Sequence, residues 1–198
     1  MTEHKVVYHY TNEDEWKAMK NGSEVYYYKA GSRQMFKSSK VRGLWPRNKF
    51  IPSYIKNLPR EAHLPVSYAL MEPEPQQWVK DGDAWSHLMS HLTQGWNPTM
   101  VLLEVNLLSI DNAYVVDAAF LPRGIGTSIE KQKELYQKRW ATRIPFRKYD
   151  GTSHSLPEVI IPTPIPLERL KMVWEKDMEK VYRRAIRLED KAYRERIG

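Results

Sequence analysis

The stretch VVYHYT at residues 6–11 alternates apolar and polar side chains and predicts the first strand of the protein. Directly after it, Asn12 is suited to cap a short helix that ends at Gly22. Trp16 and Met19 lie three apart in that helix, so both are expected to face the interior. The chain therefore begins with a strand and a helix in close succession.

The rest of the chain continues to mix strand-like and helix-like segments. Extended segments are predicted at 25–28, 66–71, 100–105, 114–117 and 149–161, and helices at 83–95 and 128–141. Between 31 and 65 the sequence is basic and interrupted by glycine and proline, which predicts loops and short turns. Strands close in sequence, separated by helices and irregular loops, indicate an α+β fold. No glycine-rich phosphate loop follows a strand, which argues against Rossmann and P-loop folds.

From residue 166 onward, apolar residues recur at spacings of three and four, with charged residues between them. This pattern predicts a long amphipathic helix. We therefore expect a domain over residues 1–165 and a basic C-terminal helix over residues 166–198. The helix would pack on the domain or, as the alternative, against a second copy in a homodimer.

The composition limits the class of protein. The 198 residues are 41% hydrophobic and 28% charged, as in a soluble globular protein. With no cysteine, disulfides, thiolate zinc sites and a cysteine nucleophile are excluded. No apolar run approaches the ~20 residues that span a bilayer, and the N-terminus lacks a signal-peptide core, so we expect a cytoplasmic protein without membrane contact. The net charge of +7 favours a polyanion such as nucleic acid, although a solvated basic surface gives the same charge.

The first strand carries polar side chains that could bind a ligand. Residues two apart on a strand project from the same face, so His9 and Thr11 share one face, while Tyr8 and Tyr10 share the other. Two hydrogen-bonding side chains at a strand end could hold the hydroxyl pair of a ribose. The competing interpretation is that His9 is a partly buried residue whose hydrogen bonds are satisfied within the fold.

A late strand carries a second such residue. Glu158 follows Pro157 and precedes the apolar residues 159–161. A carboxylate in this position must face solvent, a partner or a cleft. In a cleft it could hold a sugar hydroxyl or stabilise an oxocarbenium-like centre. The alternative is an exposed glutamate at the start of a strand.

The order HYT at residues 9–11, then EVII at 158–161 followed by IP at 165–166, resembles the ADP-ribosyltransferase superfamily. It is most similar to the branch that uses a histidine, an aromatic residue and a glutamate, which includes toxins that modify DNA bases. The resemblance implies an α+β fold with mixed or antiparallel sheets in a split arrangement, flanked by helices. It also implies NAD as the substrate.

The resemblance further implies roles for individual residues. His9 would bind ribose hydroxyls, with Thr11 and Tyr10 beside it in the NAD site, and Glu158 would be catalytic. In the family the histidine holds the hydroxyls of the adenosine-side or the nicotinamide ribose, and the resemblance places His9 with Glu158 among the catalytic residues.

The family also stacks an aromatic residue on nicotinamide, and the sequence offers three candidates. Tyr149 is followed by Ser153, a small hydroxyl residue of the kind found near the family's aromatic, but it lies close to Glu158 in sequence. Tyr68 follows a serine on a predicted strand, and Tyr54 lies in the basic loop. The sequence leaves the choice among them open.

Two further places could bind ligands. Gly43 could line the adenine or diphosphate of NAD, and Arg47 could pair with phosphate. A tight turn with a solvated basic flank, or a nucleic-acid contact by stacking and phosphate pairing, explains the same residues. His87 and His91 are four apart on a predicted helix, but no third ligand follows, so no metal site is expected.

We therefore expect an NAD-dependent ADP-ribosyltransferase, with nucleic acid as the favoured acceptor. One alternative is a non-enzymatic nucleic-acid-binding protein that uses the loop at 33–60 and the C-terminal helix. Another is a catalytically silent relative of the transferase fold. The enzyme hypothesis requires His9 and Glu158 to face one cleft.

Overall fold

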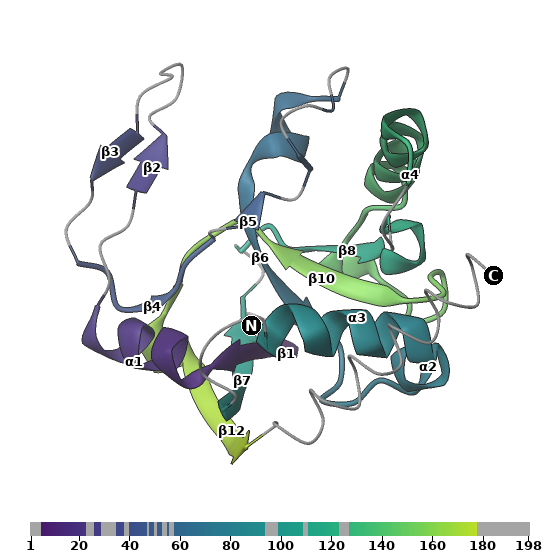
Figure 1. Ribbon diagram of the computed structural model, residues 1–198. Helices are drawn as coiled ribbons and strands as arrows, with labels where there is room; N and C mark the ends of the chain where they lie inside the picture. The colour runs from purple at the N-terminus through teal and green to yellow at the C-terminus, as the bar shows by residue number, and fades with distance from the viewer. Residues whose placement is uncertain are drawn as a thin grey trace.

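A computed structural model describes residues 5–22, 26–28, 35–37, 40–46, 48–49, 51–52, 55, 58–93, 99–108, 111–122 and 127–177. Within these ranges, helices flank a mainly antiparallel sheet, which confirms the predicted α+β class (Figure 1). The helices are α1 (Glu13–Asn21), α2 (Gln76–Lys80), α3 (Gly82–Thr93) and α4 (Ile129–Ala141). Single 3₁₀ turns are η1 (Arg60–His63), η2 (Ala118–Phe120), η3 (Phe146–Lys148) and η4 (Leu167–Arg169).

Strands lie at the predicted segments 25–28, 66–71, 100–105 and 114–117, but of the predicted segment 149–161 only residues 157–161 form a strand, and short strands also lie within 31–65, which was predicted as loops and turns. The strands are β1 (Lys5–Asn12), β2 (Tyr26–Tyr28), β3 (Met35–Lys37), β4 (Gly43–Leu44), β5 (Asn48–Lys49), β6 (Pro65–Leu70), β7 (Thr99–Leu107), β8 (Tyr114–Asp117), β9 (Ile144–Pro145), β10 (Pro157–Ile161), β11 (Ile165–Pro166) and β12 (Leu170–Asp177). The main sheet has the order β12-β7-β1-β6-β10-β8-β9, with β5 on β6. β2 pairs with β3, and β11 pairs with β4, in two small separate sheets.

The main sheet has a narrow junction in its middle. β1 pairs with β7 from Lys5↔Leu107 to Asn12↔Met100, whereas β1 and β6 share only the pair Tyr8↔Leu70. The sheet is therefore two well-paired halves, β12-β7-β1 and β6-β10-β8-β9, which meet at one residue pair.

One face of the sheet, which we call the α1 face, carries Val7, Leu103 and Val159 and is covered by α1. The predicted start of that helix is confirmed, because the Asn12 side chain accepts a hydrogen bond of 2.9 Å from the backbone N–H of Glu15. Trp16 and Met19 are buried as expected. The helix ends at Gly22, whose φ of 79° is readily adopted only by glycine. This face holds one continuous apolar core.

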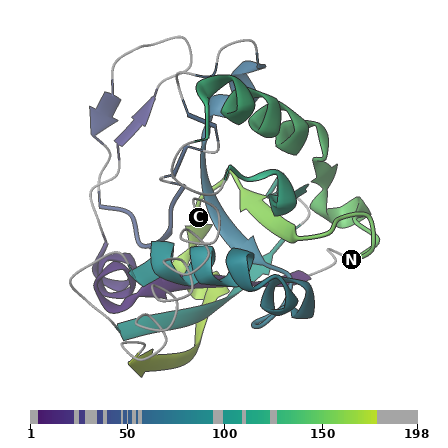
Figure 2. The ribbon, with the colours of Figure 1, turned by 45° about the vertical axis from the view of Figure 1, so that its right-hand side comes forward.

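The opposite face, which we call the Glu158 face, is covered by different helices over its two halves (Figures 1 and 2). Trp85 of α3 packs with Tyr10 and other residues of the β1–β7 half. Trp140 of α4 packs with Ile160 and other residues of the β8–β10 half. The apolar packing on this face therefore forms two clusters rather than one.

The predicted helix from residue 166 is wrong over the residues that the structure describes. Residues 170–177 form strand β12 on the edge of the main sheet, paired with β7. A bulge between Met172 and Trp174 shifts the register, so Leu170 packs on the α1 face while Trp174 packs beside Tyr10 on the Glu158 face. The bulge places the buried Leu170 and the partly buried Trp174 four residues apart, a spacing that also suits a helix. Residues 178–198, and any homodimer contact made by them, lie outside the described residues.

Candidate functional site

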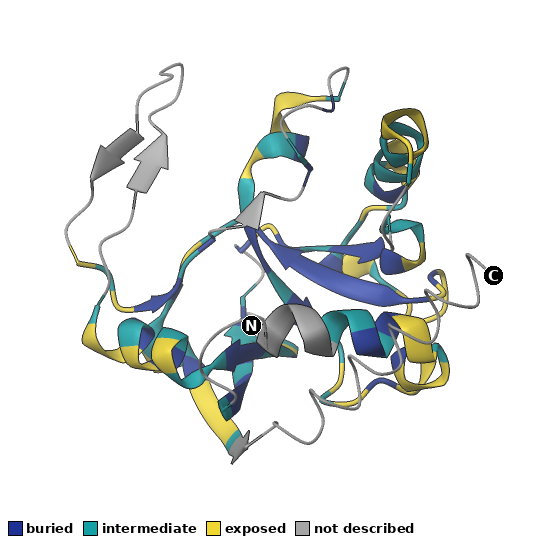
Figure 3. Cartoon of the chain, viewed as in Figure 1, coloured by how far each residue is buried: buried dark blue, intermediate teal, exposed yellow. Residues whose placement is uncertain are grey.

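Glu158 lies in line with the junction between the two halves of the sheet. Tyr8 pairs with Leu70 of β6, and Leu70 pairs on its other side with Glu158 of β10. Residues directly opposite one another on antiparallel strands project from the same face, so these three side chains share the Glu158 face. Every residue of β10 is buried, and Glu158 is only 6% exposed (Figure 3). The sequence alternative of an exposed strand-start glutamate therefore does not hold.

The Glu158 carboxylate forms an ion pair with Arg139 of α4. The contact joins Arg139 Nη2 to Glu158 Oε2, and the side chains are 2% and 8% exposed. A charge removed from water to this extent is tolerated only where an opposite charge and hydrogen bonds replace its hydration. Each of these two buried charges therefore has the other as its partner.

Tyr68 lies against the same pair. Its ring centroid is 5.7 Å from the guanidinium carbon of Arg139, a cation–π distance. Burial raises the pKa of the Tyr68 hydroxyl well above its ordinary value; Arg139 opposes this shift and Glu158 adds to it. The hydroxyl therefore stays protonated at neutral pH, where it can donate a hydrogen bond.

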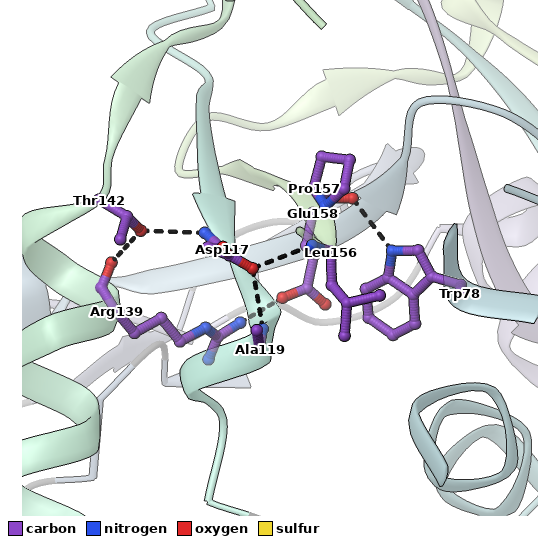
Figure 4. A network of polar contacts seen from close by, with 8 residues as sticks. All are labelled: Trp78, Asp117, Ala119, Arg139, Thr142, Leu156, Pro157 and Glu158. Carbon is purple, nitrogen blue, oxygen red and sulfur yellow. Dashed lines mark hydrogen bonds and ion pairs between the residues drawn. The ribbon is translucent and has the colours of Figure 1, made fainter. Parts of the chain in front are cut away.

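The backbone around the pair is held by Asp117, at the end of β8 (Figure 4). Thr142 follows α4, and its Oγ1 donates to the carbonyl of Arg139 at 2.8 Å and accepts from the backbone N–H of Asp117 at 2.9 Å. The Asp117 carboxylate accepts from the backbone N–H groups of Ser155 and Leu156, both at 3.0 Å. The end of α4 and the start of β10 are thus tied to the same residue.

Trp78 of α2 supports β10 from the other side. Its indole N–H donates to the carbonyl of Pro157 at 3.2 Å (Figure 4). The backbone of the three residues before Glu158 is therefore fixed by hydrogen bonds to the Asp117 carboxylate and the Trp78 indole, which limits the positions that the Glu158 carboxylate can take.

His9 contacts Tyr68 at its backbone, from the neighbouring strand β1. One step beyond Tyr8, it lies in the register of the α1 face, opposite Leu103, and not of the Glu158 face. Its Nδ1 is nevertheless 2.6 Å from the backbone carbonyl of Tyr68, across the junction between β1 and β6. The register therefore does not put the side chains of His9 and Glu158 on one face, as the enzyme hypothesis required. His9 instead contacts the backbone of Tyr68, whose ring lies beside Arg139, the ion-pair partner of Glu158.

The other two residues of the first strand that were predicted to bind a ligand, Thr11 and Tyr10, pack within the fold. Thr11 is 5% exposed and lies in the register of the α1 face, opposite Val101. Tyr10 lies on the Glu158 face, where its ring meets Trp85 and Trp174 edge-on at centroid distances of 6.1 and 6.0 Å. Its hydroxyl donates to the carbonyl of Pro73, and burial raises its pKa. Packing explains Tyr10 completely.

Tyr149 and Ser153 lie away from Glu158. Tyr149 packs against the core of the α1 face, beside the ring of His154 at 5.2 Å between centroids, and burial raises its pKa. Ser153 is in an exposed turn, where its N–H and Oγ–H both donate to Asp150. The sequence motif that joined Tyr149 to Ser153 therefore has a structural explanation.

Gly43 is required by the backbone. It pairs with Pro166 and has a φ of +128°, and a Cβ atom there would lie 2.2 Å from the carbonyl oxygen of Ile165. Two other predicted ligand residues, Arg47 and Tyr54, lie outside the described residues.

Sequence reasoning missed Arg139. The signal was present, because Arg139 comes three residues after Tyr136 and directly before Trp140 on the predicted helix, and these aromatics mark its inward face. A cation on the inward face of a helix requires a buried anion. That requirement points to one of the few acidic residues on apolar strands, and Glu158 is such a residue.

Comparisons with protein-family models, with curated proteins and with solved structures found no significant match. The described residues contain no group of three or more potential metal ligands. Of the helices in the described part of the chain, none has the length and apolar character needed to cross a bilayer.

Proposed function

We propose that the protein is an NAD-dependent ADP-ribosyltransferase of the His–aromatic–Glu type, with Glu158 as its catalytic residue. The observation that carries the proposal is the buried carboxylate of Glu158, in line with the single β1–β6 pair and beside Tyr68. Burying a carboxylate on an apolar strand is costly, and a residue placed there for folding alone would more simply be apolar.

The chemistry is the cleavage of the bond between nicotinamide and ribose. The bonding electron pair leaves with the ring nitrogen of nicotinamide, and positive charge develops on the ribose as an oxocarbenium-like centre. A carboxylate fixed beforehand beside that centre stabilises the charge without reorganising. An acceptor hydroxyl or amine then attacks the ribose carbon, and its proton passes to the Glu158 carboxylate. Glu158 would stabilise the centre and orient the acceptor.

Among the three aromatic candidates, the geometry favours Tyr68 as the residue that stacks on nicotinamide. Tyr68 lies beside the Glu158–Arg139 pair, whereas Tyr149 packs on the other face of the sheet. The narrow contact between the two halves of the sheet agrees with the split arrangement that the sequence resemblance implies.

His9 lies in the register of the opposite face from Glu158, so its proposed part in NAD binding is indirect: it holds Tyr68 across the junction between the two halves of the sheet. Its hydrogen bond to the Tyr68 carbonyl fixes the imidazole there. Loss of this side chain is therefore expected to weaken NAD binding more than it slows the chemical step.

The acceptor is proposed to be nucleic acid, and the support for this is the net charge of +7. Of the two segments of the non-enzymatic alternative, residues 33–60 are described only in part and residues 178–198 lie outside the described residues. No observation on the described residues favours that function separately. It predicts nucleic-acid binding that falls steeply with salt and is unchanged in Glu158→Ala.

The test is NAD binding by calorimetry together with nicotinamide release, in the wild-type protein and in Glu158→Gln and His9→Ala variants. Glu158→Gln is expected to keep NAD binding and to lose about 100-fold in kcat. His9→Ala is expected to raise the dissociation constant for NAD. The exposed Glu168 supplies the matched control, because Glu168→Gln removes the same charge away from β10. Wild-type protein that neither binds nor cleaves NAD would overturn the proposal.

A further inference from the structure

Arg139 is a buried cation whose position is set by the same residues that fix Glu158. It lies in the last turn of α4, and the hydroxyl of Thr142 accepts from the N–H of Asp117 and donates to the Arg139 carbonyl. Asp117 in turn accepts from the N–H of Leu156, two residues before Glu158. The side-chain contact between Arg139 and Glu158 closes this circuit (Figure 4). The carboxylate is thus held through the backbone of β10 and through the guanidinium.

The second buried arginine–carboxylate pair in the described residues shows what a purely structural pair looks like. Asp111 accepts from both terminal nitrogens of Arg169, at 2.8 and 3.1 Å, and from the N–H of Leu108 at 2.6 Å. These contacts close the turn before β8. Arg139, by contrast, crosses from a helix to a strand and lies beside Tyr68, where it closes no turn.

We propose that Arg139 is the positioning residue of the site: its guanidinium, which lies beside the Tyr68 ring, holds the Glu158 carboxylate in place. The inference rests on the proposed function. A carboxylate in an apolar environment without a countercharge takes up a proton, and a neutral carboxyl group does not stabilise a developing positive charge. Arg139 therefore acts through Glu158, and we do not assign it a contact with substrate.

Arg139→Gln and Arg139→Lys test this inference, with kcat, KM and the dissociation constant for NAD measured separately. Arg139→Gln is expected to lower kcat by about 100-fold while NAD binding stays unchanged, because a misplaced catalytic group slows chemistry without removing a ligand contact. Arg139→Lys keeps the charge but not the planar guanidinium, so it is expected to recover part of kcat. A role in stability alone would give no such separation of kcat from binding.

Arg169→Gln is the matched control, because it removes an arginine from the other buried pair. It is expected to leave kcat per folded molecule at the wild-type value. Unchanged kcat in folded Arg139→Gln would overturn the positioning role and leave the transferase intact, as would an equal loss in Arg169→Gln. If Arg139→Gln does not fold, wild-type kcat in Arg139→Lys overturns the role and a reduced kcat with unchanged binding supports it. A wild-type protein without NAD cleavage overturns both proposals at once.

Discussion

In the part of the chain that the structure describes, two buried carboxylates pair with arginines, and the two pairs differ in what the fold requires of them. Asp111 lies just before β8, where it accepts from a local backbone N–H and from both terminal nitrogens of Arg169. Glu158 pairs with Val116 near the end of the same strand, between the apolar clusters under α3 and α4. The first pair is explained by a turn. The second occupies a place in the sheet that apolar residues would fill at lower cost.

The fold needs the Asp111–Arg169 pair, whereas it only tolerates the Glu158–Arg139 pair. The α1 face of the same sheet shows the default arrangement, with one continuous apolar core under α1. On the Glu158 face the core is divided, and the charged pair and Tyr68 lie at the division. Buried charge without a local structural purpose is a mark of functional sites.

The largest expected effect is on stability, from removing one partner of the Glu158 pair. Glu158→Leu leaves Arg139 buried without its anion and is expected to lower the free energy of unfolding by about 3–5 kcal/mol. The double variant Arg139→Met/Glu158→Leu should recover most of this loss, because two apolar side chains replace two charges. Urea denaturation followed by circular dichroism measures both values.

Arg169→Met supplies the comparison for that experiment. The Arg169 side chain is 17% exposed, so water can reach Asp111 after the substitution, and the expected loss is about 1–3 kcal/mol. If the double variant were no more stable than Glu158→Leu, the Glu158 pair would be serving the fold in the same way as the Asp111 pair.

The next effect is a pH dependence that arises from Tyr68. Burial raises its pKa above the ordinary value of 10.0, so between the unfolded and folded pKa values the native state binds more protons than the unfolded state. The free energy of unfolding is therefore expected to be constant below about pH 10 and to fall as the pH rises above it. Tyr68→Phe should reduce this fall without abolishing it, because burial also raises the pKa values of Tyr10 and Tyr149. Denaturation at a series of pH values from 8 to 11 measures the difference. An unchanged slope in Tyr68→Phe would show that Tyr68 is not buried beside the pair.

The smallest expected effect is a change in the pKa of an exposed carboxylate, Asp150. Asp150 has a pKa lowered to about 2, first by the backbone N–H of Thr152 and then by the hydroxyl of Ser153. In Ser153→Ala the pKa is expected to rise only part of the way to 3.8, because the Thr152 hydrogen bond remains. An NMR titration of the Asp150 side chain measures this. A pKa unchanged by the substitution would mean that the turn alone sets it.

Local features of the fold could be predicted from the sequence because neighbouring residues determine them. Asn12, Trp16 and Met19 lie within one short segment, and their cap and inward face follow from spacing alone. The prediction of a helix from residue 166 was wrong because a strand with a bulge packs Leu170 and Trp174 against the core four residues apart, and this spacing is also typical of a helix. Sequence periodicity therefore cannot distinguish a strand with a bulge from a helix.

The site depends on information that no single segment contains. That Glu158 aligns with Tyr8 rather than with His9 follows from the registers of three strands, and a shift of one residue would reverse it. The identity of Glu158 as an unusual residue was predictable from its apolar strand. Its partner Arg139 lies on a helix whose docking position only the tertiary structure supplies.

The most direct test of the account compares nicotinamide release from NAD by Glu158→Gln and by Asp111→Asn, each corrected for its folded fraction. Both variants neutralise a buried carboxylate that pairs with an arginine. We predict that Glu158→Gln loses about 100-fold in kcat while folded Asp111→Asn retains the wild-type rate. Equal rates in the two variants would contradict the claim that the Glu158 pair is the functional one.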